Sequence, residues 1–307
     1  MTLPTHYAIR NTQSTEVARR IQGYLHRKAR VGREALIVGG FTLYLHGGEA
    51  GSGVSLVLPN RPACDLHPSV LERMEGIFAR RGQIVCFQLL DSFAPGLVET
   101  LSGLGYGVQE CLPALVCLPG QVVKPPAPAE VPTQPPHPSP PQIGEGTGST
   151  PPPIWGRLGG GDLLPAELEM VTVSSDSSPE DVAENWNINA RGFDPSATLA
   201  QSSDVLDFRR SLDKSRAFTA RLDGLGVCAG MYTDIVEGVT ELVGIATLHA
   251  YRRRGIGGAL TVYATQTAFA DGASLVFLTA ANEGAGRVYQ RVGFRPLGNQ
   301  LLLAKKI

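Results

Sequence analysis

Apolar positions form two dense regions in this chain, and about 45 residues with very few apolar side chains lie between them. In the second region, short apolar runs typical of strands alternate with longer stretches typical of helices. The predicted strands are residues 167–173, 215–222, 227–233, 239–248 and 274–280. The predicted helices are residues 179–191, residues 206–212 and a helix that opens near residue 255. This order predicts a mixed α/β fold.

The first region repeats part of this order. Residues 35–46, 54–58 and 83–89 predict strands, and residues 68–81 predict a helix. Residues 97–118 resemble residues 287–305, because each segment predicts a helix, a glycine–aromatic pair and two strands. Gly105-Tyr106 corresponds in this comparison to Gly293-Phe294. We interpret the first region as an internal repeat of the second. The alternative is an unrelated α/β domain that happens to share this ending.

Proline marks the boundary between the two regions. Thirteen of the 23 prolines lie between Pro119 and Pro153, and Gly159-Gly160-Gly161 follows as a candidate hinge. A segment of this composition cannot bury enough apolar surface to offset the entropy of ordering, so we expect an extended linker. The sequence therefore predicts a first domain at 1–120, a Pro/Gly-rich disordered linker at 121–164 and a second domain at 165–307.

Charge and cysteine content narrow the class of protein. The chain has 27 Lys and Arg against 28 Asp and Glu, a net charge of −1. That balance argues against a nucleic-acid or membrane-surface partner. Five cysteines without metal-ligand spacing predict no metal site and a reducing compartment. We find no signal peptide and no apolar run long enough to span a membrane, so we expect a cytoplasmic protein.

The junction after residues 239–248 carries the strongest candidate chemistry. The apolar strand runs directly into a turn that opens a helix, made of Arg252, Arg253, Arg254, Gly255, Ile256, Gly257 and Gly258. Glycines allow close approach of the backbone to a ligand, and a helix N-terminus favours an anion. Arginines add phosphate contacts. The order predicts a phosphate-binding turn, whereas the spacing fits neither a dinucleotide fingerprint nor a nucleotide-triphosphate loop. A glycine-rich turn with solvated arginines is the alternative.

These residues resemble the signature of the GNAT family of acetyl-CoA-dependent N-acyltransferases. Arg252-x-x-Gly255-x-Gly257 matches the family pattern Gln/Arg-x-x-Gly-x-Gly/Ala. A second family segment, Asn-x-x-Ala-x-x-x-Tyr-x-x-x-Gly-Phe, is similar to the run that contains Asn282, Ala285, Tyr289, Gly293 and Phe294. The resemblance covers about 165–307. It implies a mixed, mostly antiparallel sheet flanked by helices, and here two GNAT-like domains joined by the Pro-rich linker. Strands four and five of this fold splay apart around the cofactor.

The resemblance also implies a reaction and roles for single residues. Acetyl-CoA is the expected co-substrate, and a primary amine of a small molecule or peptide attacks its thioester directly in a ternary complex. The backbone of Ala246, Thr247 and Leu248 is expected to bond the pantetheine, and the turn Arg252–Gly258 the pyrophosphate. Glu241 is the candidate base and Tyr289 the candidate acid. A non-catalytic acyl-CoA-binding or sensing protein is the alternative.

Each of these side chains also has a structural interpretation that stays open. Glu241 stands either at a catalytic position or at the solvent-facing start of a strand. Tyr289 lies on the apolar face of its helix, where core packing is the alternative. Asn282 either bonds the cofactor or caps a helix. The acceptor pocket is expected from residues 184–213 and 234–238, whose acidic side chains either attract a cationic amine or are plain surface.

The first region lacks the corresponding chemistry. Its loop, PNRPACDLHPSV, has no glycine and several prolines, which cannot supply the N–H donors that a phosphate needs. Aligning Gly105 with Gly293 puts Leu101 at the position of Tyr289. We therefore expect a degenerate half that packs on the catalytic half or lines its amine pocket. The chain is expected to act as a monomer, a pseudo-dimer of its halves, or as a homodimer.

Overall fold

A computed structural model describes residues 11–47, 55–62, 66–123 and 168–305. The linker predicted at 121–164 and the glycine hinge lie almost entirely outside these residues. In the N-terminal half the helices are α1 (Asn11–Arg30), α2 (Pro68–Ala79) and α3 (Leu97–Gly103). Its strands are β1 (Arg33–Val38), β2 (Phe41–His46), β3 (Leu56–Pro59), β4 (Cys86–Leu90) and β5 (Tyr106–Cys117).

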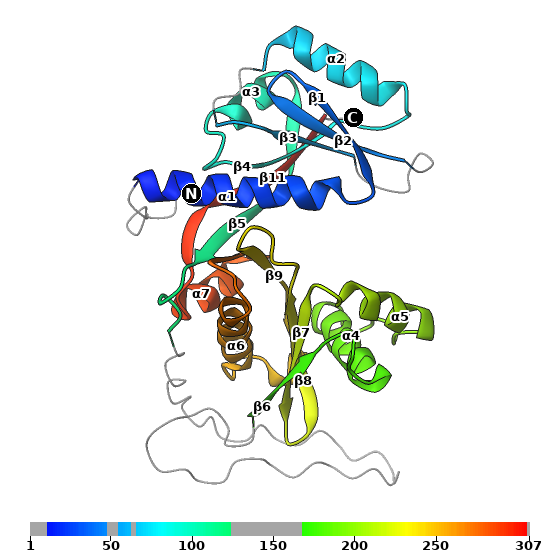
Figure 1. Cartoon of the computed structure of the whole chain (residues 1–307), viewed down its shortest axis with the longest axis vertical. Coiled ribbons are helices and arrows are strands. Elements are labelled where there is room, and N and C mark those ends of the chain that lie inside the picture. The colour runs from blue at the N-terminus through cyan, green and yellow to red at the C-terminus, as the bar shows by residue number, and fades with distance from the viewer. Residues whose placement is uncertain (1–10, 48–54, 63–65, 124–167, 306–307) are drawn as a thin grey trace, which may run out of the picture.

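The C-terminal half follows the predicted alternation. Its strands are β6 (Leu168–Val173), β7 (Arg216–Leu222), β8 (Leu225–Tyr232), β9 (Val239–Thr247), β10 (Leu275–Thr279) and β11 (Arg295–Lys305). Its helices are α4 (Pro179–Phe193), α5 (Ser202–Ser211), the 3-10 turn η1 (His249–Tyr251), α6 (Ile256–Ala270) and α7 (Glu283–Arg291). Helices α6 and α7 pack on one side of the sheet, and α4 and α5 pack on the other (Figure 1).

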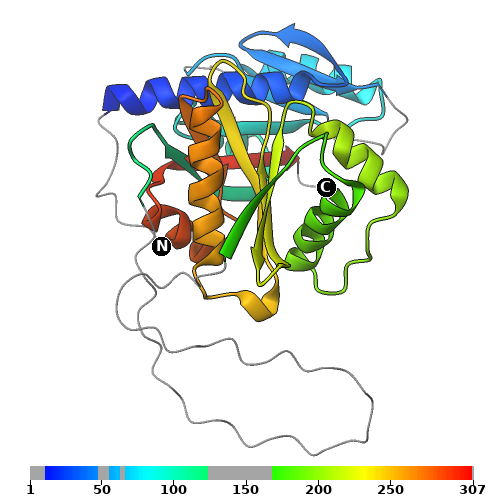
Figure 2. The same ribbon diagram turned by 60° about the horizontal axis from the view of Figure 1, so that its bottom comes forward.

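The described strands form one 11-stranded sheet that runs through both halves, in the order β1-β2-β3-β4-β11-β5-β10-β9-β8-β7-β6. Most neighbours are antiparallel, and β3–β4 and β9–β10 are parallel. The expected mixed, mostly antiparallel sheet flanked by helices is therefore confirmed. Figure 2 shows α6 and the strands β6–β9 below the helix α1, which crosses the top of this half.

The two halves exchange strands. The C-terminal strand β11 lies between β4 and β5 of the N-terminal half and is antiparallel to both. In return, the end of β5, from Ala114 to Cys117, pairs with β10 of the C-terminal half. Each half therefore completes its part of the sheet with a strand from the other (Figure 1).

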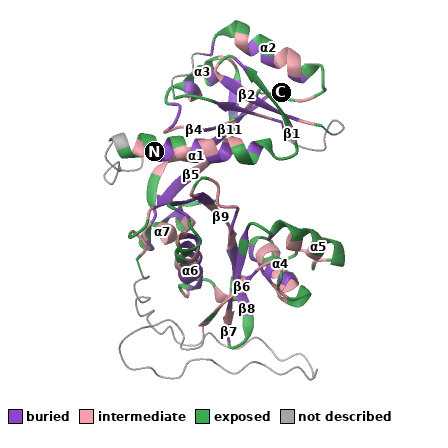
Figure 3. Ribbon diagram, viewed as in Figure 1, coloured by how far each residue is buried: buried purple, intermediate pink, exposed green. Residues whose placement is uncertain are grey.

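The hydrophobic cores cross the same boundary. The N-terminal core includes Val239, Leu275 and Phe277 of the C-terminal half. The C-terminal core includes Leu115 and Cys117 from β5. Buried residues follow β10 and the end of β5, where the two halves meet (Figure 3). Burial of apolar surface therefore holds the halves against each other, in addition to the shared hydrogen bonds of the sheet.

The structure differs from the predicted elements in three places. Residues 35–46 are a hairpin, β1 and β2, because Gly39 adopts φ +60° and turns the chain between them. Residues 97–118 and 287–305 each contain one long strand, β5 or β11, where two were predicted. Helix α1 was not predicted, although its buried residues Val17, Ile21 and Tyr24 are spaced as on one face of a helix.

Candidate functional site

Strands β9 and β10 separate after a short parallel contact. They pair only from Leu275 opposite Val239 to Phe277 opposite Glu241. Beyond that point, β10 continues against β5, and among the described strands β9 has a partner only on its β8 side. The backbone of β9 from Leu242 to Thr247 therefore presents an open edge towards the diverging β10. An extended ligand can add to such an edge through main-chain hydrogen bonds.

A bulge in β9 reverses which side chains face which side of the sheet. Gly244 has φ +65°, and the pairing with β8 shifts register here. Leu242 and Ile245 both pack on the α6 side, although alternation alone would separate them. Asn189 of α4 donates a hydrogen bond from its side-chain amide to the Gly244 carbonyl. Asn189 thus fixes the bulge, a role that the sequence did not suggest because the contact spans 55 residues.

The turn after β9 is held in place by the first arginine of the predicted motif. The Arg252 guanidinium donates to the Thr247 carbonyl at 3.1 Å and to the Gly192 carbonyl at 2.6 Å. These bonds tie the turn to the end of β9 and to the end of α4. Its side chain therefore positions the turn, whereas Arg253 is exposed and has φ +61°. The Arg254 side chain folds back, with a bond to the Ala250 carbonyl at 3.2 Å.

The N-terminus of α6 offers a row of backbone donors. The first helical hydrogen bond runs from the Ala259 amide to the Gly255 carbonyl at 3.0 Å. The amides of Ile256, Gly257 and Gly258 precede it, and no described residue accepts from them. Gly255 caps the helix with φ +76° and no atom within 4 Å of its virtual Cβ. Amides and helix dipole together form a site suited to an anion.

The predicted pantetheine-binding segment is only partly free. The Leu248 amide already donates to the Val227 carbonyl at 2.9 Å, and its carbonyl accepts from the Tyr251 amide at 2.9 Å. The Thr247 hydroxyl donates to the Cys228 thiol at 3.2 Å on the α6 side. A Cβ on Gly257 would lie 3.3 Å from that hydroxyl. Ala246 faces α4, where it contacts Gly192. The open edge of β9 therefore ends before Leu248.

Glu241 lies where β9 and β10 begin to diverge. It shares a face of the sheet with Val239, which packs in the core beside α1. Among the described residues its carboxyl group has no hydrogen-bond partner. Burial raises the pKa of Glu241 to about 7, against a smaller lowering by the charge of Lys28. A carboxylate with this pKa suits proton abstraction near neutral pH. It is not a solvent-facing strand start.

Tyr289 lies on α7, on the opposite side of the sheet from Glu241. Its ring packs in the C-terminal core, 6.3 Å from the Phe294 ring centroid. No described residue hydrogen-bonds its hydroxyl. Burial raises the pKa of Tyr289 to about 12, and the nearby Cys228 adds to this. The hydroxyl therefore keeps its proton at neutral pH and can donate it, so packing and proton donation are compatible.

Asn282 acts as the N-cap of α7. Its side-chain oxygen accepts from the Ala285 amide at 3.0 Å.

In the N-terminal half, α2 is the helix that corresponds to α6, and its N-terminus is built differently. At α2, the His67 ring accepts from the Ser69 amide at 3.3 Å, and Pro68 has no N–H to offer. Leu101, the counterpart of Tyr289, is fully buried.

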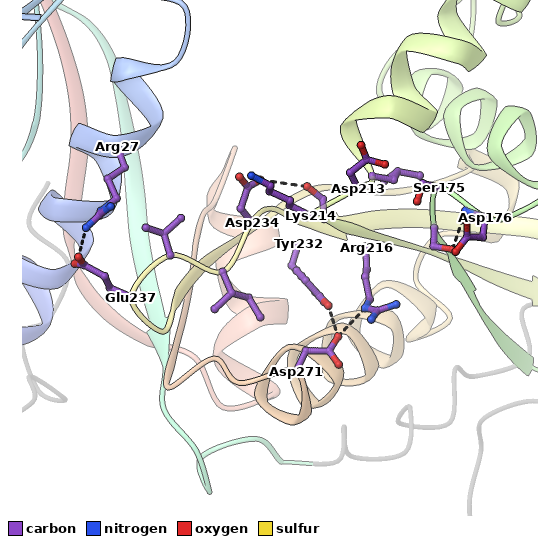
Figure 4. Close-up of a pocket in the computed structure, with 15 residues that line it drawn as sticks. Arg27, Ser175, Asp176, Asp213, Lys214, Arg216, Tyr232, Asp234, Glu237 and Asp271 are labelled. Atoms are coloured by element: carbon purple, nitrogen blue, oxygen red, sulfur yellow. Dashed lines mark hydrogen bonds and ion pairs between the residues drawn. The ribbon is translucent and has the colours of Figure 1, made fainter.

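A cavity of about 860 Å³ lies near the other end of β9 (Figure 4). Its wall combines Arg27 of α1 with residues 174–176, 212–216, 232, 234–237 and 271 of the C-terminal half. Two ion pairs lie in this wall, Arg27 with Glu237 and Arg216 with Asp271 at 2.7 Å. Asp213, Asp234 and Glu237, expected near the acceptor, are part of this wall. Neither Glu241 nor Tyr289 lines the cavity, so it is distinct from the open edge of β9.

The described residues contain no group of three or more His, Cys, Asp or Glu side chains placed to hold a metal ion. Within the same residues, no helix combines the length and the apolar character needed to cross a membrane.

This chain is similar to known proteins in sequence and in fold. Residues 183–294 match the model of the acetyltransferase (GNAT) family. A GCN5-related N-acetyltransferase from Kribbella flavida is 25% identical, with a TM-score of 0.66 over 95% of this chain and 96% of that chain. A GCN5-related N-acetyltransferase from Sphaerobacter thermophilus is 14% identical, with a TM-score of 0.57 over 99% and 96%.

A third solved structure has the tandem arrangement in its description. It is a tandem GNAT protein from the clavulanic acid biosynthesis pathway, 11% identical, with a TM-score of 0.53 over 87% of this chain and 78% of that chain. A search of curated proteins finds no match. Residues 183–294 therefore match the acetyltransferase (GNAT) family, and the chain shares its fold with solved GNAT proteins, one of them a tandem GNAT protein.

Proposed function

We propose that the C-terminal half transfers an acetyl group from acetyl-CoA to a primary amine by direct attack in a ternary complex. The observation that carries this proposal is the open edge of β9, which leads directly into the Arg252–Gly258 turn and the N-terminus of α6. An extended arm that ends in phosphates has the shape and charge to follow this path. The GNAT match over residues 183–294 supports the same reaction class.

The residues present fit a pyrophosphate at the turn. The amides of Ile256, Gly257 and Gly258 lack described acceptors, and the space beside Gly255 is open. Arg253 is exposed at the same turn and supplies positive charge. Bound acetyl-CoA would supply a thioester, whose carbonyl carbon accepts a nucleophile. In this proposal Arg252 acts on the cofactor indirectly, by holding the turn.

The positions of Glu241 and Tyr289 on opposite sides of the sheet suggest how the protons move. The Glu241 carboxylate takes a proton from the amine on the α1 side as the new carbon–nitrogen bond forms. The Tyr289 hydroxyl gives a proton to the sulfur on the α7 side as the carbon–sulfur bond breaks. Glu241 gains one proton and Tyr289 loses one, so the reaction is balanced once solvent returns both groups to their starting protonation states.

A thiol-release assay with acetyl-CoA over a panel of primary amines tests the function. The expected result is amine-dependent thiol release above the hydrolysis background, reduced at least about a hundredfold in Glu241→Gln or Tyr289→Phe. Isothermal calorimetry with acetyl-CoA separates binding from turnover. Tight binding without turnover on any amine would instead support the acyl-CoA-sensing alternative.

The setting of the enzyme is part of the proposal. Cys86, Cys111, Cys117 and Cys228 are free thiols, which suits a reducing compartment such as the cytoplasm. The acceptor is proposed to be a small-molecule or peptide amine. Because the halves already share one sheet, we propose that the chain acts as a monomer.

A further inference from the structure

Helix α1 of the N-terminal half crosses the face of the sheet on which Glu241 lies. Tyr24 and Ile21 of α1 are buried in one core with Val239 and Phe277, which flank the point where β9 and β10 diverge. The Tyr24 ring meets the Phe277 ring edge to face, with centroids 5.2 Å apart. The side of the sheet from which the amine would approach is therefore lined by the half that has no phosphate-binding turn.

A chain of hydrogen bonds links α1 to the backbone of Glu241. The Tyr24 hydroxyl is hydrogen-bonded to the Thr233 hydroxyl. The Thr233 amide donates to the Glu241 carbonyl at 3.0 Å, and the Glu241 amide donates to the Thr233 hydroxyl at 3.4 Å. Tyr24 thus holds Thr233, and Thr233 in turn is hydrogen-bonded to both the amide and the carbonyl of Glu241.

Lys28 lies one helical turn after Tyr24. Its ammonium group is 6.0 Å from the centroid of the Tyr24 ring. It is the cation of α1 that acts on the Glu241 carboxyl, since Arg20 is bonded to Ser274 and Gly238 and Arg27 is paired with Glu237.

Besides the hydroxyls of Tyr24 and Thr233, an aromatic ring and an acidic side chain lie near Glu241. β10 places Phe277 opposite it, and Asp234 follows Thr233 at the end of β8. Burial raises the pKa of Tyr24, and the charges of Glu241 and Asp234 add to this, so Tyr24 stays neutral beside them. Lys28 is therefore the charge that favours the ionised form of Glu241.

We propose that α1 completes the base site of the C-terminal half, with Tyr24 as a positioning residue that fixes the backbone of Glu241 through Thr233 and with Lys28, beside the Tyr24 ring, as a positioning residue that supplies positive charge on the same side. This proposal rests on the proposed function, because it assumes that Glu241 is the base. It also assigns the N-terminal half a part in acyl transfer that a purely structural repeat would not have.

The test compares Lys28→Met, which keeps the length of the side chain without its charge, with Lys28→Arg, which restores the charge. Arg19→Met is the matched control, because Arg19 lies on the same helix and pairs only with the exposed Glu16. Lys28 is exposed, so the variants are expected to fold. The readouts are the pH dependence of kcat/KM and the titration of the Glu241 carboxyl by carbon-13 NMR, assigned as the signal lost in Glu241→Gln.

In Lys28→Met, both midpoints should move about half a pH unit upward, which lowers kcat/KM about threefold on the acid side. Lys28→Arg should restore them, and Arg19→Met should leave them unchanged. The gap between wild type and Lys28→Met should close near 1 M salt, where the Debye length is about 3 Å.

Three results distinguish the possibilities. An unchanged midpoint in Lys28→Met, or an equal shift in Arg19→Met, would overturn the role of Lys28. A shifted NMR titration with no acyl transfer by the wild-type chain would support the coupling of Lys28 to Glu241 and reject the enzymatic function. Shifts in both readouts would support the inference as stated.

Discussion

The half-buried carboxyl group of Glu241 should make the protein less stable as the pH rises, and Glu241→Gln removes this effect. Burial raises the pKa of Glu241 to about 7 from an ordinary value of 4.5. The unfolded chain therefore loses this proton at lower pH than the folded chain does. The stability that the protonated group contributes is fully present below pH 4.5, and it is lost as the pH rises through about 7.

The size of the effect follows from the two pKa values. The difference between about 7 and 4.5, at about 1.4 kcal/mol for each pH unit, corresponds to about 3 kcal/mol. At pH 8 the free energy of unfolding is lowered by nearly this whole amount relative to low pH, and at pH 5 it is lowered by about 1 kcal/mol. Glutamine has a similar shape and no charge. Glu241→Gln should thus raise the free energy of unfolding by up to about 3 kcal/mol at pH 8 and by about 1 kcal/mol at pH 5.

Urea denaturation at both pH values measures these differences. Glu169→Gln is the control, because it makes the same substitution at an exposed position of β6 and should change neither value. A Glu241→Gln variant that is less stable than wild type at pH 8 would refute the reasoning, since it would mean that a partner stabilises the carboxylate. The same variant should lose acyl transfer, so the base position trades stability for activity.

Three further substitutions test the rest of the site. Gly257→Glu should abolish acetyl-CoA binding in calorimetry, because it adds bulk and negative charge at the α6 N-terminus; Gly103→Glu, in open space on α3, should leave binding intact. Tyr289→Phe should lower kcat about a hundredfold and leave the Kd for acetyl-CoA within about twofold; an unchanged kcat would assign Tyr289 to packing alone. Arg252→Ala removes two bonds to backbone carbonyls and should raise that Kd about tenfold; equal binding would show that the turn holds its shape unaided.

Local features of the site could be predicted from sequence because neighbouring residues determine them. The strand, the glycine turn and the start of α6 are consecutive in the chain, and the helical spacing around Tyr289 gives α7 its buried face. The exchange of β5 and β11 could not be predicted, because their pairing depends on segments far apart in sequence. For the same reason the link between Tyr24 and Glu241 could not be predicted, because the two residues are 217 positions apart and the sequence around each does not indicate the other. Arg252 was predicted to bind phosphate, and its guanidinium instead binds two carbonyls of the protein.

The strand exchange gives a physical reason for keeping a half that lacks the phosphate-binding turn. Strand β10 leaves β9 after Phe277 but stays paired with β5, because Leu278 and Thr279 lie opposite Leu115 and Ala114. The N-terminal half therefore supplies the strand that supports β10 where it has diverged from β9. It also supplies the helix that lies over Glu241, so it forms two of the boundaries of the proposed acyl-transfer site. The N-terminal half can make both contributions without a phosphate-binding turn of its own, because they depend on β5 and α1 and not on the loop before α2.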